Sequence, residues 1–170
     1  MTRALFFALA LLAVPLLARG ADPVVPAANQ EQGQCPAAAS FTPRAQALVQ
    51  AINADDPALA VDVFFPAAAF DLVKDLPVPG RYHRRLSAWF VEDLRALAAA
   101  LPGDLVFERF ELGRCRWTAR GVEGNRLPYW SCWHNTLHVR RGGKSRRIDV
   151  VDVINWGEEW YVTHLGPVRK

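Results

Sequence analysis

The sequence predicts an α+β domain in which N-terminal helices pack on a curved antiparallel meander of four strands. Apolar residues recur at helical spacing over residues 45–52 and again over residues 82–101. From residue 105 onward the pattern changes to the alternation that is typical of strands, and glycine-containing breaks divide it like the turns of a meander. A chain of 170 residues that is 51% hydrophobic is long enough to form one domain with a substantial core.

The N-terminus has the organisation of a secretory signal peptide. Arg3 precedes an apolar stretch over residues 4–17, and small residues flank Arg19 at an expected cleavage point after Gly20. We therefore expect a signal peptide at 1–20, a flexible linker rich in Pro, Ala and Gln at 21–40, and a single α+β domain at 41–170. The expected localisation is exported, either periplasmic or secreted, with a retained membrane anchor as the alternative.

Charge excludes one class of partner. The net charge of +3 falls to +1 when residues 1–20, with two arginines, are removed, so nucleic acid is a poor partner. No other stretch is long enough to cross a bilayer, and we expect no transmembrane span after signal cleavage.

The helices follow in order. Thr42 and Pro43 form a cap and a first-turn proline, and residues 53–57 end the helix that they begin. The dense apolar residues of 59–65 predict a buried segment, and Pro66 begins a short helical segment that ends near Lys74. Residues 82–101 form the clearest helix, with an apolar face that predicts packing on a sheet.

Strand register follows from the turns. A turn at Glu123-Gly124 pairs residues 105–118 with residues 129–140, and a second turn at Gly142-Gly143 pairs the latter with residues 148–154. One face is then apolar, and a slip by one residue would destroy this agreement. Its apolar members are Phe110, Leu112, Trp133, Leu137, Val139, Ile148, Val150 and Ile154. The other face carries Arg109, Glu111, His134, Thr136, His138, Asp149 and Asn155, and we expect the two histidines to face solvent.

Polar residues on the apolar face are the candidate catalytic residues. A three-residue turn at 157–159 places Asp152 opposite His164, whereas a two-residue turn places it opposite Thr163, and the alternation of strand residues favours the first. Asp152 could orient His164 or take a proton itself, and Asn135 could donate to an oxyanion. The alternative is a satisfied polar cluster that only fixes strand register.

Three cysteines occur in the chain. The predicted register places Cys115 opposite Cys132, which favours a disulfide over two buried thiols in an exported protein. Cys35 is then the odd cysteine. No Cys/His set has zinc spacing, so we expect no metal and no cofactor.

A basic cluster surrounds the Gly142-Gly143 turn. The interpretation that we favour is a solvated hairpin tip that blocks edge pairing; the alternative is contact with an anionic surface. Its members are Arg140, Arg141, Lys144, Arg146 and Arg147.

The second half of the chain, which ends in VVDVINWGEEWYVTHLGP, resembles NTF2-like (SnoaL-like, ketosteroid-isomerase-like) domains. The resemblance implies a cone-shaped fold with a pocket between sheet and helices. The sequence departs from that family because it has no early strand pair before the helix at residues 82–101. The family's catalytic aspartate is therefore not carried over to any residue here.

Two functional hypotheses remain. The favoured one is a non-catalytic exported binding or accessory domain whose cleft holds a small apolar ligand or an envelope protein. Its candidate ligand contacts are Trp133, Trp89, Phe110 and Arg114. The alternative is a small cofactor-free isomerase, dehydratase or hydrolase that uses Asp152, His164 and Asn135.

Overall fold

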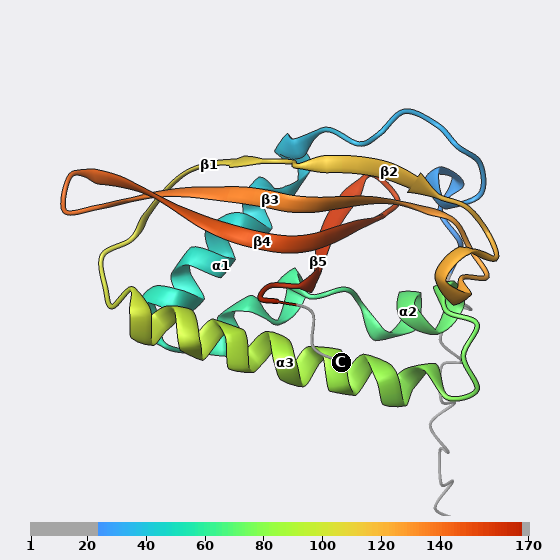
Figure 1. Ribbon diagram of the computed structural model, residues 1–170, viewed down its shortest axis with the longest axis horizontal. Coiled ribbons are helices and arrows are strands. Elements are labelled where there is room, and N and C mark those ends of the chain that lie inside the picture. The colour runs from blue at the N-terminus through green and yellow to red at the C-terminus, as the bar shows by residue number, and fades with distance from the viewer. Residues whose placement is uncertain (1–23, 168–170) are drawn as a thin grey trace, which may run out of the picture.

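The computed structural model describes residues 24–167, and the expected signal peptide at 1–20 lies outside the described residues. The protein is an α+β fold with one antiparallel sheet (Figure 1). The helices are α1 (Thr42–Ala54), α2 (Ala67–Val73) and α3 (Pro79–Ala100), with 3₁₀ segments η1 (Ala27–Asn29), η2 (Ala38–Phe41), η3 (Pro57–Val63) and η4 (Val122–Gly124). The strands are β1 (Val106–Glu111), β2 (Arg114–Thr118), β3 (Tyr129–Arg141), β4 (Lys144–Trp156) and β5 (Glu159–His164).

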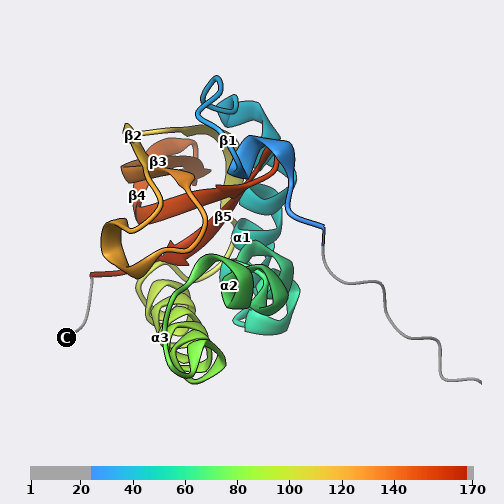
Figure 2. The same ribbon diagram turned by 90° about the vertical axis from the view of Figure 1, so that its right-hand side faces the viewer.

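Strand β3 is the centre of the sheet. It pairs on one side with both β1 and β2 and on the other with β4, which in turn pairs with β5. Figure 2 shows α2 and α3 on one side of this sheet. No helix within residues 24–167 is long and apolar enough to cross a membrane.

The predicted register is confirmed at the central strands. Cys115 lies opposite Cys132, and a disulfide joins them. Trp133 lies opposite Asp152, as the Gly142-Gly143 turn predicted. The two-residue turn at Gly142-Gly143 is observed. The turn predicted at Glu123-Gly124 is wrong, because residues 119–128 form a loop that contains η4, although the register derived from that turn is correct.

The sheet has five strands instead of the expected four, because the first expected strand, over residues 105–118, is interrupted at Gly113. Its amide donates to Asn135 Oδ1 (3.0 Å) instead of continuing the ladder. A Cβ on Gly113 would lie 2.0 Å from the Trp133 carbonyl oxygen and 2.4 Å from that of His134, so only glycine allows this approach. His134 itself has a positive φ of 56°. The ladder with β3 is therefore interrupted between β1 and β2 without a change of register.

The prediction of a flexible linker over residues 21–40 is wrong from residue 24 onward. Asn29 is fully buried and donates from Nδ2 to the carbonyls of Pro128 (3.2 Å) and Asn155 (3.3 Å), while its Oδ1 accepts from the Gly157 amide (2.7 Å). Trp160 Nε1 donates to the Pro36 carbonyl (3.3 Å). Composition gave no sign of this because the contacts are made by single residues without periodicity.

Two residues of the face opposite the apolar one are buried. The segment of residues 24–41 accounts for Asn155, which is fully buried and whose carbonyl accepts from the buried Asn29. His138 is also buried, and its Nε2 lies 2.9 Å from Glu111 Oε2. Of the two histidines that were expected to face solvent, only His134 is exposed.

The helices bury the other face. Phe41 packs on Phe110 with ring centroids 4.4 Å apart, and Leu86, Phe90 and Leu94 of α3 are buried. The segment expected to be buried at residues 59–65 is only partly so. Val63, Phe64 and Phe65 are buried, and the last two join β5 through a bridge between Phe64 and Val162 and a bond from the Phe65 amide to the Val162 carbonyl. Leu59 and Val61, on η3, are instead 48% and 68% exposed.

Candidate functional site

A cavity of about 680 Å³ lies between the sheet and the first half of α3, with the end of α2 and the loop after it closing one side. This volume is in the range of sites for small molecules. Its apolar walls include Phe70, Val73, Leu76, Tyr82, Leu86, Trp133 and Ile154, and its polar groups are Lys74, Arg81, Arg85, Glu123, Tyr129, Asp152, Thr163 and His164. We call this cavity the cleft.

Asp152 is the buried carboxylate of the cleft. It lies on β4 with 6% of its surface exposed. Its Oδ1 accepts from Ser131 Oγ (2.9 Å) and its Oδ2 from Thr163 Oγ1 (2.6 Å). Burial raises the pKa of Asp152 to about 6, although these two bonds favour the ionised form. Asp152 therefore exchanges its proton close to neutral pH.

His164 lies beside it without a hydrogen bond. Its Nδ1 is 3.9 Å from Asp152 Oδ2. The atom is buried and has no hydrogen-bond partner. Burial lowers the pKa of His164 and so favours the neutral imidazole. The wall of the cleft thus contains a ring nitrogen without a hydrogen-bond partner next to a buried carboxyl group.

A second polar group comes from the end of α2. Lys74 Nζ donates to Asn125 Oδ1 (2.6 Å) and to the Tyr129 hydroxyl (3.1 Å). Burial lowers the pKa of Lys74 and raises that of Tyr129. Lys74 and Asp152 each stabilise the charged form of the other, so the two groups belong to one electrostatic site.

Arginines from the first turns of α3 border the cleft. Arg81 and Arg85 are exposed, and Arg85 stacks over the ring of Tyr82 at 4.8 Å. With Lys74 they give three cations against the carboxylates of Glu123 and Asp152. The cleft is therefore positive on balance, and more so when Asp152 is protonated.

The structure brings two of the three candidate catalytic residues together. Asp152 and His164 lie on the cleft wall, whereas Asn135 is fully buried and does not line it. Asn135 Nδ2 donates to the carbonyls of Cys132 (2.7 Å) and Val150 (2.9 Å). Its amide is committed to the backbone at the Gly113 break, so the expected oxyanion role is wrong.

Only one of the four candidate ligand contacts lines the cleft. Trp133 does so. Phe110 is in the core against Phe41, and Arg114 is exposed on β2. Trp89 lies further along α3, and the Arg85 guanidinium is 5.3 Å from the centroid of the Trp89 ring. Strand register predicts which face of the sheet each residue occupies. It does not predict at which residues along a strand the cleft opens between the sheet and α3.

Sequence reasoning missed Lys74 and Tyr129 as site residues. The sequence predicts Lys74 only as the end of a helical segment and Tyr129 only as the start of a strand. Their meeting depends on the loop of residues 119–128, where the Asp75 amide donates to the Gly124 carbonyl (2.7 Å). No periodic pattern predicts that contact.

Two other features lie outside the cleft. A cavity of about 700 Å³ between η3 and α3 has mostly apolar walls and includes no buried carboxylate. The basic cluster lies on the β3–β4 hairpin, with Arg140, Lys144, Arg146 and Arg147 exposed and Arg140 paired with Glu108. Neither feature combines apolar walls with convergent buried polar groups as the cleft does.

Comparisons of the chain with protein-family models, with curated proteins and with solved structures found no match.

Proposed function

We propose that the protein binds a small amphipathic molecule with an anionic head group in the cleft. The observation that carries the proposal is the combination, in one cavity of about 680 Å³, of apolar walls with Lys74, Arg81 and Arg85. An apolar body would pack between Leu86 and Trp133, while the head group would meet the cations. The sequence predicted a small apolar ligand. The three cations of the cleft add the expectation that this ligand carries a negative charge.

The arrangement of sheet and helices agrees with an NTF2-like cone that lacks the early hairpin, and we propose that architecture for the fold. Between α1 and α3 the structure has η3, α2 and two isolated bridges, at Phe64 and Lys74. The support is architectural and adds nothing to the identity of the ligand.

An aromatic sulfonate such as anilinonaphthalene sulfonate tests the binding proposal. Its charge is constant between pH 5 and pH 8, so any pH dependence comes from the protein. We expect saturable binding at one site that is tighter at pH 5 than at pH 7.5, because protonation of Asp152 removes a negative charge from the cleft. The Asp152→Asn variant should bind with little pH dependence in this range.

Matched arginine variants locate the site. Arg81→Gln with Arg85→Gln should weaken binding of the sulfonate about three- to tenfold, since each exposed charge contributes up to ~1 kcal/mol. Arg84→Gln is the control, because Arg84 is exposed on the same helix but does not line the cleft. Equal loss in the control, or no saturable binding, would refute the proposal.

A second candidate function is cofactor-free proton transfer, as in an isomerase or dehydratase. Asp152 favours it, because a buried carboxyl with a pKa of about 6 beside the buried, unbonded Nδ1 of His164 is suited to take and return a proton. Asp152→Asn should then abolish turnover of any substrate found among the ligands while the ligand still binds. Full activity in Asp152→Asn would leave only the binding function.

A further inference from the structure

The three cysteines of the chain meet at one point of the fold. The Sγ atoms of Cys35, Cys115 and Cys132 all lie within 4.8 Å of one another. Cys115 and Cys132 form the disulfide between β2 and β3, and Cys35 is a free thiol. The residue that looked like an odd linker cysteine is therefore the direct neighbour of the bond.

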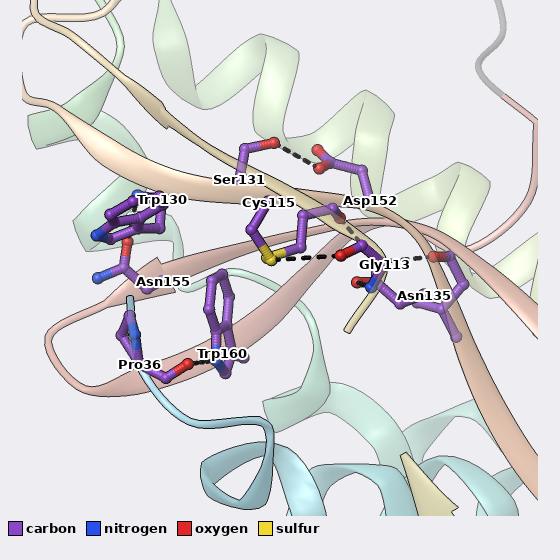
Figure 3. The surroundings of a disulfide bond; sticks show 11 residues. Pro36, Gly113, Cys115, Trp130, Ser131, Asn135, Asp152, Asn155 and Trp160 are labelled. Atoms are coloured by element: carbon purple, nitrogen blue, oxygen red, sulfur yellow. Dashed lines mark hydrogen bonds between the residues drawn. A yellow bond between two sulfur atoms is a disulfide. The ribbon is translucent and has the colours of Figure 1, made fainter. Parts of the chain in front are cut away.

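Contacts on both sides of Cys35 hold it in this position. Pro36, the next residue, accepts from Trp160 Nε1 (3.3 Å), and Figure 3 shows this bond beside the disulfide. Earlier in the segment, Asn29 is anchored by three hydrogen bonds to the backbone of Pro128, Asn155 and Gly157. The thiol is thus presented to the disulfide by structure that is itself buried.

We propose that these cysteines form a thiol–disulfide exchange site in which Cys35 attacks Cys132. The Cys35–Cys132 bond forms as the Cys115–Cys132 bond breaks. Cys115 leaves with the electron pair as a thiolate and takes up the proton that Cys35 gave up. The number of disulfides does not change, so the step needs no external oxidant or reductant.

The surroundings of the two sulfurs assign Cys115 as the leaving group. Cys132 is fully buried, whereas Cys115 is only half-buried, so a departing thiolate is better solvated at Cys115. The Cys115 Sγ also lies 3.7 Å from the Gly113 carbonyl oxygen, which would accept from the resulting thiol. Burial raises the pKa of the Cys35 thiol, which makes the exchange slow at neutral pH.

The exchange would change what the disulfide holds together. In the structure it joins two paired strands of one sheet. After exchange it would join the segment of residues 24–41 to the central strand β3 and release β2 from its covalent link. The same three sulfurs would thus stabilise either the pairing of β2 with β3 or the attachment of the segment of residues 24–41 to β3.

The location of the single free thiol tests the proposal. The full chain is incubated at pH 8, quenched with acid, denatured, and alkylated with N-ethylmaleimide at low pH, and unreduced peptides are identified by mass spectrometry. We expect label to shift in part from Cys35 to Cys115, together with a Cys35–Cys132 peptide, to the same extent at every protein concentration. Cys35→Ser is the control and should remain unlabelled.

Label confined to Cys35 in the wild-type chain would overturn the exchange, and label that rises with protein concentration would show that it occurs between molecules. Label on Cys132 would overturn the assignment of Cys115 as leaving group. The Cys115→Ser variant tests whether Cys35 lies close enough to Cys132 to form a bond, independently of the exchange rate. After equilibration with reduced and oxidised glutathione, we expect it to contain the Cys35–Cys132 bond. Two free thiols in that variant, folded by near-ultraviolet circular dichroism, would contradict the placement of Cys35.

Discussion

Thr163 donates a 2.6 Å hydrogen bond to Asp152, although the ladder between β4 and β5 places His164 opposite that residue. The cause is a register shift between Asp152 and Val153. The turn is the two-residue type, with Trp156 opposite Glu159, which by itself would have put Thr163 opposite Asp152. The shift inserts Thr163 as an extra residue, so that both Thr163 and His164 face the carboxylate.

The pH dependence of stability should report the burial of Asp152. Its pKa in the folded protein, about 6, is above the ordinary value of 3.8, so the folded state holds the proton more tightly than the unfolded state. The resulting stabilisation is complete below pH 4 and is lost as pH rises through 6, and the loss is about 3 kcal/mol. Urea unfolding from pH 4 to pH 7 should show wild type losing stability relative to Asp152→Asn.

Asp149→Asn is the matched control for that measurement. Asp149 is on the same strand, and its side chain is 58% exposed beside His134. Because the Asp149 side chain is exposed, we expect its difference from wild type to change less with pH than the Asp152→Asn difference does. A constant difference for Asp152→Asn would show that Asp152 has an ordinary pKa.

Gly113→Ala should destabilise the protein by about 3 kcal/mol or more, because the new methyl group would overlap the backbone carbonyls of β3. Gly33→Ala is the control, since a Cβ there meets nothing within 4 Å. Thermal unfolding of both variants checks the prediction. Equal melting temperatures would mean that β1 and β2 do not approach β3 as closely as described.

Asn135→Ala should cost about 3 kcal/mol or more of the free energy of unfolding, because it removes a fully buried side chain that makes three hydrogen bonds, to the Gly113 amide and to the carbonyls of Cys132 and Val150. Ligand binding by the folded fraction should be unchanged, since Asn135 does not line the cleft. Titration with the sulfonate at low temperature measures this. Loss of affinity in a folded variant would return Asn135 to the list of site residues.

Asn29→Ala should release the segment of residues 24–41 from the sheet. The change removes three hydrogen bonds of a fully buried side chain and should cost about 2–3 kcal/mol. Hydrogen exchange should rise at the Gly157 amide, which loses its acceptor. Gln30→Ala, whose side chain makes only an exposed bond to the Val25 carbonyl, should behave like wild type.

The fold was predictable wherever apolar periodicity and turn glycines acted together. Gly142-Gly143 aligned Trp133 with Asp152, and the same reasoning placed Cys115 opposite Cys132. What failed depends on single contacts between distant residues. The strand break at Gly113 requires Asn135 on another strand, and the burial of Asn155 requires Asn29, more than a hundred residues away.

The candidate site was predictable to a similar extent. Asp152 was predictable because a polar residue on an apolar face stands out in sequence. His164 was placed opposite it by a three-residue turn that is wrong, since the turn has two residues and His164 pairs with Asp152 only because of the register shift. Lys74 and Tyr129 have no such signal, since they meet only after the loop between β2 and β3 folds back on the end of α2. The assignment of Asn135 as an oxyanion donor was wrong for a physical reason: a buried amide on that face had backbone groups to satisfy at the strand break.

The two long central strands have a consequence for the order of folding. β3 and β4 are joined by only two residues, as are β4 and β5, so closing either hairpin has a lower entropic cost than pairing β1 or β2 with β3. The β3–β4 hairpin is the longer of the two. We therefore expect the hairpin to form early in the transition state and the pairing of α3 with the sheet to form later. Trp133 and Asp152 sit directly opposite each other in the hairpin. One wall of the cleft would then be assembled as a nucleus of folding, before the helix that encloses it has docked.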